Sequence, residues 1–169
     1  ALHAQAQQYP TRPIRLISPY PPGGSNDLIA RTLAQKLGDA FKQQVVVDNR
    51  AGANGIVGSE IVAKSPPDGY TIMTGAISTH GINPGLYAKL PYDAVKDFAP
   101  VMNINIGPNV LVVTAGLPVN SVRELIAYGK ANPGKLTFAS SGTGTVYHLS
   151  GEMFKSMAAL DMTHIPYKG

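Results

Sequence analysis

Two stretches of the sequence combine glycines with hydroxyl or amide side chains, as anion-binding loops do. They read PPGGSND at positions 21–27 and SSGTGTVYH at positions 140–148. Glycine lets the backbone approach a ligand closely, and the N–H groups at the start of a helix attract negative charge. Each stretch therefore predicts a site for an anion such as a carboxylate. A plain capped turn between a strand and a helix is the alternative.

Neither stretch matches a nucleotide-binding motif. The first has no lysine of the kind that phosphate-binding loops carry. In the second, Gly142 and Gly144 occupy two of the three glycine positions of a dinucleotide fingerprint, but the third position holds Tyr147. A nucleotide is therefore a poor candidate ligand, and no cofactor is expected.

Residues that usually perform catalysis or bind metals are sparse. Cysteine is absent, the four histidines lack the spacing of metal ligands, and no serine lies in a nucleophile elbow. We therefore expect binding rather than catalysis, and no metal site. The alternative is an α/β enzyme that acts on an anionic small molecule, with His80 or His148 as acid or base.

The pattern of apolar residues predicts the elements that position the first loop. Apolar runs alternate with runs of helical spacing, in the order strand, helix, strand, helix, strand. The expected ranges are 15–19, 25–41, 44–49, 54–65 and 69–76, with Ser25 or Asn26 as the cap of the first helix. Continuous apolar strands separated by helices are typical of a parallel sheet covered on both faces.

A second strand–helix pattern positions the second loop. A capping box formed by Ser121 and Glu124 opens a helix that stops at Pro133. A strand at 135–141, a helix at 144–160 and a strand at 162–167 follow. In open α/β sheets, ligands bind beyond the carboxyl ends of the strands. Both loops lie at such ends, as does the stretch AISTHG at 76–81.

Composition narrows the partners and the compartment. The formal charge is +4, but Lys and Arg are scattered and Trp is absent, so no nucleic-acid partner is expected. No apolar run approaches the roughly 18–20 residues of a membrane span. Residues 1–10 are polar and contain Ala4-Gln5-Ala6, a pattern that signal peptidase cuts after. We interpret them as a flexible lead-in after a cleaved signal peptide, which favours the periplasm, with an ordinary ragged terminus as the alternative.

Several longer motifs together resemble one bacterial family. They are PYPPGGSNDLIARTLAQKL, VVVDNRAGANGIVGSEIVAKSPPDGYT, STHGINPGLYAKLPYDAVKDFAPV, ANPGKLTFASSGTGTVYHLSGEMF and HIPYKG. The pattern is similar to that of the Bug family, the TctC-like substrate-binding receptors of tripartite tricarboxylate transporters. The resemblance implies an α/β fold of the periplasmic-binding-protein type II-like class. Its two lobes, each with a parallel-core sheet, would close on a small carboxylated ligand in the cleft between them.

The resemblance also implies a ligand, a partner and a site. The ligand would be a dicarboxylate, a tricarboxylate, an amino acid or an aromatic carboxylate, delivered to membrane transporter subunits. Loop amides, hydroxyls and ordered waters would hold it. The expected contacts in the first lobe are Tyr20, Gly23, Gly24, Ser25, Asn26, Asp27, Ser78, Thr79 and His80. Those in the second lobe are Ser141, Gly142, Thr145 and His148.

The length of 169 residues is short for this class, because two lobes of about 150 residues each need roughly 300. We interpret the chain as truncated before its C-terminal part. Residues 11–105 would form the first lobe without its return segment, and residues 106–169 the start of the second. Exposed apolar faces are then expected, with self-association or a domain-swapped dimer as the result. Failure of such a piece to bind ligand is a further alternative.

Overall fold

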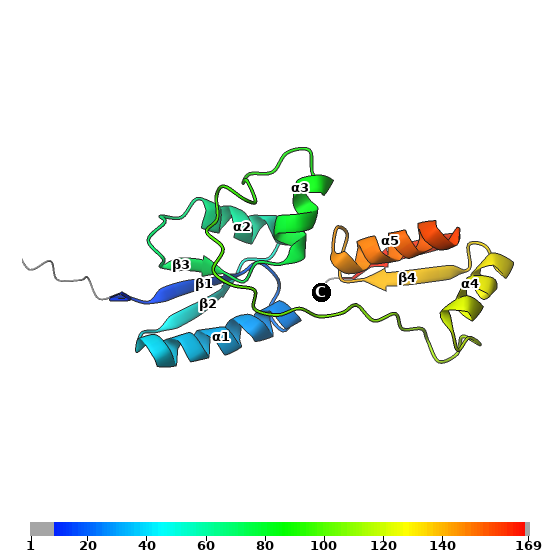
Figure 1. The fold of residues 1–169 in the computed structure, drawn as a ribbon, viewed down its shortest axis with the longest axis horizontal. Helices are drawn as coiled ribbons and strands as arrows, with labels where there is room; N and C mark the ends of the chain where they lie inside the picture. Colours follow the sequence, from blue (N-terminus) through cyan, green and yellow to red (C-terminus); the bar gives the residue numbers. More distant parts are fainter. Residues whose placement is uncertain (1–8, 168–169) are drawn as a thin grey trace, which may run out of the picture. The chain divides into compact units, whose positions relative to one another are not determined.

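The computed structural model describes residues 9–167, so most of the lead-in expected at 1–10 lies outside the described residues. The chain divides into two compact units, Ala1–Phe98 and Ala99–Gly169 (Figure 1). We call them unit 1 and unit 2 and describe each by itself. The division falls earlier than the expected boundary at 105/106.

Unit 1 is built on three parallel strands. They are β1 (Ile14–Ser18), β2 (Val45–Asn49) and β3 (Thr71–Met73), in the spatial order β2-β1-β3. Ile14 lies opposite Val45, and Arg15 lies opposite Thr71, so β1 is the central strand. The parallel sheet expected from the continuous apolar runs is confirmed.

Two helices connect these strands and lie on opposite sides of the sheet (Figure 1). They are α1 (Ser25–Phe41) and α2 (Ile56–Ala63). Crossovers between parallel strands are right-handed. The connection from β1 to β2 runs across the sheet in one direction and that from β2 to β3 in the other, so their helices lie on opposite faces. Leu16, Ala30 and Ala34 form the buried core between α1 and the sheet. The bounds of α1 are those expected from its helical spacing.

The cap of α1 differs from the expectation. Gly24, rather than Ser25 or Asn26, is the N-cap, and no side chain bonds to the first turn as a cap. Ser25 is already the first helical residue, and the Asn26 side chain is used in a different contact, described below. The remaining elements of unit 1 are η1 (Ala53–Gly55), the π-helical turn η2 (Ser78–Ile82) and α3 (Asn83–Leu86).

Unit 2 has a smaller sheet of two parallel strands. Its elements are α4 (Val122–Ala131), β4 (Leu136–Ser140), α5 (Val146–Ala158) and β5 (Met162–Pro166). Its buried core consists of Leu125, Leu136, Ala158, Leu160 and Met162. The capping box is confirmed, because the Glu124 amide donates to Ser121 Oγ at 3.2 Å and the Glu124 carboxylate accepts from the Asn120 amide at 2.7 Å.

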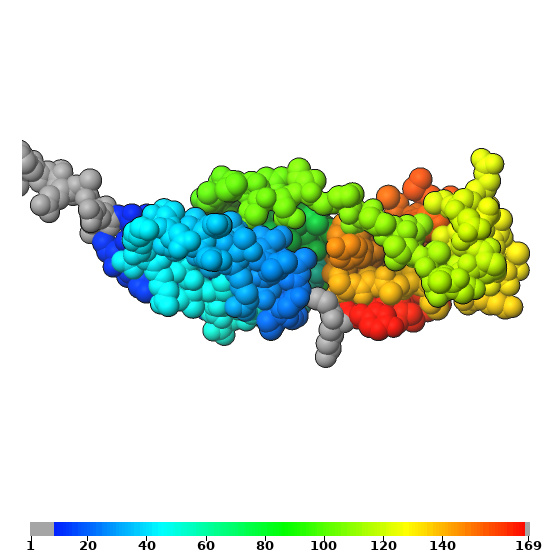
Figure 2. Space-filling model, turned by 90° about the horizontal axis from the view of Figure 1, so that it is seen from below, coloured from blue at the N-terminus to red at the C-terminus, as the bar shows by residue number. Residues whose placement is uncertain are grey.

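Residues 101–113 contain no helix or strand, although they are rich in β-branched side chains. Val101, Ile106 and Val112 are 89%, 88% and 78% exposed. Figure 2 shows yellow-green residues of this segment on the molecular surface. None of the helices within residues 9–167 is long and apolar enough to cross a membrane.

Candidate functional site

Asp27 fixes the loop that joins β1 to α1. Its side chain is buried, and its carboxylate accepts hydrogen bonds from Arg31 Nε, the Gly23 amide and Asn49 Nδ2, each at 2.9 Å. The φ angle of Gly23 is +88°, a value that favours glycine. The hydrogen bonds, that of Arg31 above all, lower the pKa of Asp27 to about 2. Asp27 is therefore ionised at neutral pH and orders the loop.

Asn26 anchors the start of α1 to the sheet. Its Oδ1 accepts from Ser18 Oγ at 3.0 Å and from Thr74 Oγ1 at 2.7 Å, and its Nδ2 donates to the Thr74 carbonyl at 3.2 Å. The side chains of Asn26 and Asp27 are thus both engaged within the protein.

The groups that this loop offers to a ligand are backbone amides. Among residues 9–167, nothing accepts a hydrogen bond from the amides of Gly24, Ser25 and Asn26. The first N–H groups of a helix have no partner within the helix and attract negative charge. They can therefore donate to an anion.

The predicted residues on η2 are mostly buried. Thr79 is fully buried, and its hydroxyl bonds to the Ala76 backbone and lies 2.8 Å from His80 Nδ1. Ser78 is also buried. The hydroxyl oxygen of Tyr20 is buried too and makes no hydrogen bond of standard geometry with the described residues. Burial raises the pKa of Tyr20, whereas the nearby Ser78 side chain lowers it.

His80 lies in an aromatic setting. Burial lowers the pKa of His80, so the ring is neutral at pH 7. Its ring meets that of Phe98 edge-on at 4.6 Å, and it lines a pocket of about 420 Å³ together with Tyr87, Leu90 and Tyr92. No carboxylate of the described residues forms an ion pair with it. Among the described residues, its hydrogen-bond partner is therefore the Thr79 hydroxyl and not a carboxylate.

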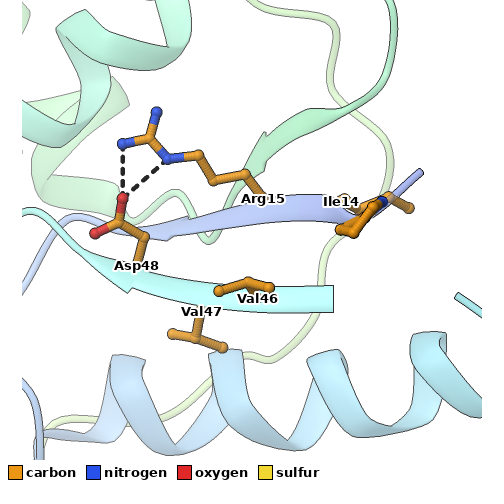
Figure 3. Close-up of a pocket in the computed structure, with 6 residues that line it drawn as sticks. Ile14, Arg15, Val46, Val47 and Asp48 are labelled. Atoms are coloured by element: carbon orange, nitrogen blue, oxygen red, sulfur yellow. Dashed lines mark hydrogen bonds and ion pairs between the residues drawn. The ribbon is translucent and has the colours of Figure 1, made fainter. Parts of the chain in front are cut away.

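A second pocket in unit 1, also of about 420 Å³, lies against β1 and β2. Figure 3 shows Arg15 and Asp48 on the side of these strands away from α1, and Val47 pointing toward α1. Arg15 bonds to Asp48 Oδ2 through Nε at 2.9 Å and Nη2 at 2.6 Å, and Arg50 bonds to Oδ1. Burial raises the pKa of Asp48, but the hydrogen bonds from the two arginines lower it overall. These charges pair with one another and join two strands.

The loop of unit 2 runs from β4 into α5. Thr145 is the N-cap of α5, because its Oγ1 accepts from the His148 amide at 3.4 Å, and it also donates to the Gly142 carbonyl at 2.7 Å. Gly142 has a φ of +128°, again in the region that favours glycine. Within the described part of the chain, no group bonds to the amide or the hydroxyl of Ser141. The Ser141 groups are therefore available to a ligand.

A residue that the sequence analysis did not single out, His164, supports this loop. Its Nε2 lies 2.7 Å from Ser140 Oγ, and its ring stacks on that of His148 with centroids 4.1 Å apart. His148 Nδ1 in turn accepts from the Gly144 amide at 3.2 Å. His148 thus contacts the loop through the Gly144 amide, and His164 contacts it through the Ser140 hydroxyl. The alternation of side chains along β4 and β5 could have indicated the contact of His164 with the loop, because residues two positions apart in a strand lie on the same face of the sheet.

The described residues contain no group of three or more His, Cys, Asp or Glu side chains that could hold a metal ion. Each unit instead presents a strand, a glycine-containing loop and a helix. Among the described residues, nothing accepts from the amides of Ser25 and Asn26 at the start of α1, or from those of Val146 and Tyr147 at the start of α5. Parallel α/β units with ligand groups at the carboxyl ends of the strands are typical of binding proteins that hold small anions.

Comparisons with known proteins agree with this class. The chain shares 42% identity and a TM-score of 0.89 with the structure "R. palustris Rpa4515 with adipate", over 95% of this chain and 54% of that one. For "MatC (Rpa3494) from Rhodopseudomonas palustris with bound malate", the identity is 29%, the TM-score 0.84 and the coverage 95% and 55%. For periplasmic binding protein BugD, they are 33%, 0.77, 95% and 54%. The chain has the α/β fold of the periplasmic binding proteins.

The sequence profile of the tripartite tricarboxylate transporter family receptors matches residues 29–169. The chain belongs to this family. It is 43% identical, over 164 residues, to the UPF0065 protein in the tcbD-tcbE intergenic region of Pseudomonas sp. (strain P51). That alignment covers 95% of this chain and 48% of the relative. The chain therefore spans about half the length of the curated relatives that it matches.

Proposed function

We propose that this protein is an extracytoplasmic receptor that binds a small carboxylate through the loops at residues 20–27 and 140–148. The observation that carries the proposal is the set of backbone amides in these loops that lack acceptors among the described residues. The family supports it, because related structures hold adipate and malate, which are both dicarboxylates.

The chemistry of the loops suits a carboxylate bound by neutral donors. Neither loop contains a lysine or an arginine. A carboxylate has two oxygens that together accept about four hydrogen bonds, and bonds to a charged acceptor are stronger than neutral ones. Several amides and hydroxyls can therefore hold the anion without a positively charged side chain. In this proposal Asn26 and Asp27 shape the first loop. The donors to the ligand are Gly24 and Ser25 in the first loop, and Ser141 and the amide of Val146 in the second.

We also infer a location in the periplasm and delivery of the ligand to a membrane transporter. The family description and the periplasmic relatives support both. The enzymatic alternative would need a carboxylate to orient the base, and among the described residues neither His80 nor His148 forms an ion pair with one.

The proposal is tested by titrating the purified chain with adipate and with malate in a calorimeter. Adipamide, which has the length of adipate but no charge, is the matched control. We expect heat and a rise of the unfolding temperature with at least one carboxylate, because a ligand that binds only the folded state stabilises it. Adipamide should have no such effect. Absence of binding by both carboxylates, or equal binding of adipamide, would overturn the proposal.

A further inference from the structure

Three aromatic rings of unit 2, those of Phe138, His148 and His164, stack against one another next to the loop. Phe138 stacks on His164 with centroids 4.9 Å apart, and His164 stacks on His148 at 4.1 Å. Phe138 and His164 are paired positions on the parallel strands β4 and β5, and His148 lies in the first turn of α5. We call His148 and His164 the imidazole pair. The three rings thus come from three elements of unit 2, β4, β5 and α5.

Each ring of the pair is attached to a different part of the loop. His164 Nε2 and Ser140 Oγ share a hydrogen bond of 2.7 Å, and Ser140 Oγ also accepts from the Gly142 amide at 3.1 Å. His148 Nδ1 accepts from the Gly144 amide at 3.2 Å. The positions of Gly142 and Gly144 thus depend on the two rings.

The bond to Gly144 requires a neutral ring. A ring nitrogen accepts a hydrogen bond only when it carries no proton, and both nitrogens of a charged imidazole are donors. A protonated His148 would therefore face the Gly144 amide with a donor against a donor. Two charged rings stacked at this distance would also repel each other.

Among the described residues, few charged groups act on His164. The groups that face His164 are His148 and Glu152, both on α5, and Lys155 pairs with Glu152 at 3.6 Å. Burial and, after it, His148 lower the pKa of His164, while Glu152 raises it, and the overall direction is downward. The surroundings thus favour the neutral ring at pH 7.

Gly151 allows this arrangement. A side chain at this position would collide with the Phe138 ring, so the glycine lets α5 lie directly on β4. This close approach determines how near α5 lies to β4 and β5, the strands that carry Phe138 and His164.

We propose that His164 is a positioning residue whose bond to Ser140 and stack on His148 hold the loop at residues 140–145 in its binding geometry, and that the His148 bond to Gly144 completes this geometry only while the His148 ring is neutral. Acidification then releases the loop and weakens carboxylate binding. The effect on binding rests on the proposed function, whereas the effect on the loop does not.

The first experiment needs no ligand. The ring nitrogens of both histidines and the amides of Gly23 and Gly144 are followed by nuclear magnetic resonance from about pH 7.5 to about pH 5.5, the range in which histidines titrate. We expect the two rings and the Gly144 amide to change together, because interacting groups titrate as a pair. The Gly23 amide should stay constant. Independent titration of the rings, or a constant Gly144 amide, would overturn the inference.

Four variants test the roles of the two rings. His164→Gln keeps a polar group near the Nε2 position and cannot titrate in this range, and His164→Phe keeps a stacked ring but no partner for Ser140. His148→Asn keeps an acceptor at the Nδ1 position, and His148→Phe does not. We expect His148→Asn to retain the Gly144 amide signal of the neutral protein at both pH values, and His148→Phe to lose it at both, because His148 is the residue that accepts from this amide. His164→Gln should keep the signal at about pH 7.5 and lose it at about pH 5.5, because His148 is still present. His164→Phe should shift it already at about pH 7.5, because Ser140 loses its partner on β5.

The second experiment measures the affinity for malate at the same two pH values. We expect the wild-type affinity to fall on acidification, by no more than about tenfold. This limit follows because the neutral fraction of an ordinary histidine falls about tenfold when the pH is one unit below its pKa. Affinity in His148→Asn should not fall beyond the change due to malate itself. Stronger binding of the wild type in acid, relative to this variant, would overturn the inference. Absence of malate binding with an intact coupled titration would count against the proposed function alone.

Discussion

The two loops occupy the same position in their units, after a parallel strand and before a helix, but they are held by different chemistry. In unit 1, an ionised carboxylate on α1, Asp27, binds the loop amide of Gly23 and the side chains of Arg31 and Asn49. In unit 2, the corresponding bonds come from the hydroxyls of Ser140 and Thr145 and from the imidazole pair, in which His148 accepts through an unprotonated nitrogen and burial lowers the pKa of His164. One loop therefore depends on charge and the other on its absence.

The sign of the pH dependence follows from this difference. The pKa of Asp27, about 2, lies below the ordinary value near 4, so its stabilising effect is present above about pH 4 and is lost as the pH falls from about 4 toward 2. The pKa of His164 is also lowered, but from an ordinary value near 6.5. Its effect is present above about pH 6.5 and decreases below it. The hydrogen bonds that order the two loops should thus be lost in different pH ranges.

The largest effect is expected from removing the charge in unit 1. Asp27→Ala leaves Arg31, Asn49 and the Gly23 amide without their shared acceptor, and should lower the unfolding temperature of this unit by roughly 5–10 °C. Calorimetry measures this change. Asp39→Ala, at an exposed position of the same helix, is the control and should change little. Equal stability of the two variants would show that Asp27 does not hold the loop.

Removing one amide from each loop compares the two as ligand sites. Proline lacks an N–H group and is tolerated at the first position of a helix. Gly24 (φ −80°, ψ 172°) and Thr145 (φ −76°, ψ 161°) have the extended conformation that a following proline requires. We expect Ser25→Pro and Val146→Pro each to weaken carboxylate binding roughly ten- to a hundredfold, because each removes a donor to a charged group.

Titration calorimetry checks this pair of variants. Ser25→Ala and Val146→Ala keep the amides and are the matched controls. A loss in only one of the two proline variants would show that one loop alone holds the anion. Unchanged affinity in both would contradict binding by helix amides.

A smaller effect is expected from the caps of the two helices. Thr145→Ala removes the side-chain cap of α5 and should lower the free energy of unfolding by about 1 kcal/mol, because capping side chains typically contribute that amount. Gly24→Ser would add a cap to α1 and should raise it by only about a few tenths of a kcal/mol. Denaturant unfolding measures both. A much larger gain from Gly24→Ser would contradict the small difference expected between glycine and serine at an N-cap.

The smallest effect is the difference in acid sensitivity. Between about pH 7.5 and about pH 5.5, hydrogen exchange should become faster for the amides of residues 140–145, after correction for the intrinsic rate. The corrected rate at residues 20–27 should stay constant. Equal change in both loops would contradict the assignment of different chemistry to them.

The sequence predicted most of the elements because local signals define them. The helix at 25–41 has apolar residues at helical spacing, and the structure gives it the same bounds. The capping box at Ser121 is likewise a local pattern and forms as expected. The strands have no comparable terminal signal, and β3 is shorter than the predicted range 69–76.

The parts of the site that the sequence missed depend on contacts between distant positions. His164 meets Ser140 only because β4 and β5 pair in parallel register. The resemblance to the family placed Asn26 and Asp27 among the expected ligand contacts. Their actual partners, Thr74 and Asn49, come from other strands. Burial of Thr79 also follows from packing against elements that a sequence pattern does not place.

The exposed segment at residues 101–113 has a consequence for how the protein behaves in concentrated solution. It carries no charged residue, and its second half reads NVLVVTA from position 109. Valine and leucine side chains there are exposed, and their backbone is not paired in a strand. Uncharged runs of high β propensity stack with copies of themselves into cross-β fibrils. Pro108 interrupts the run once, so within this segment the hazard of self-association lies in residues 109–115.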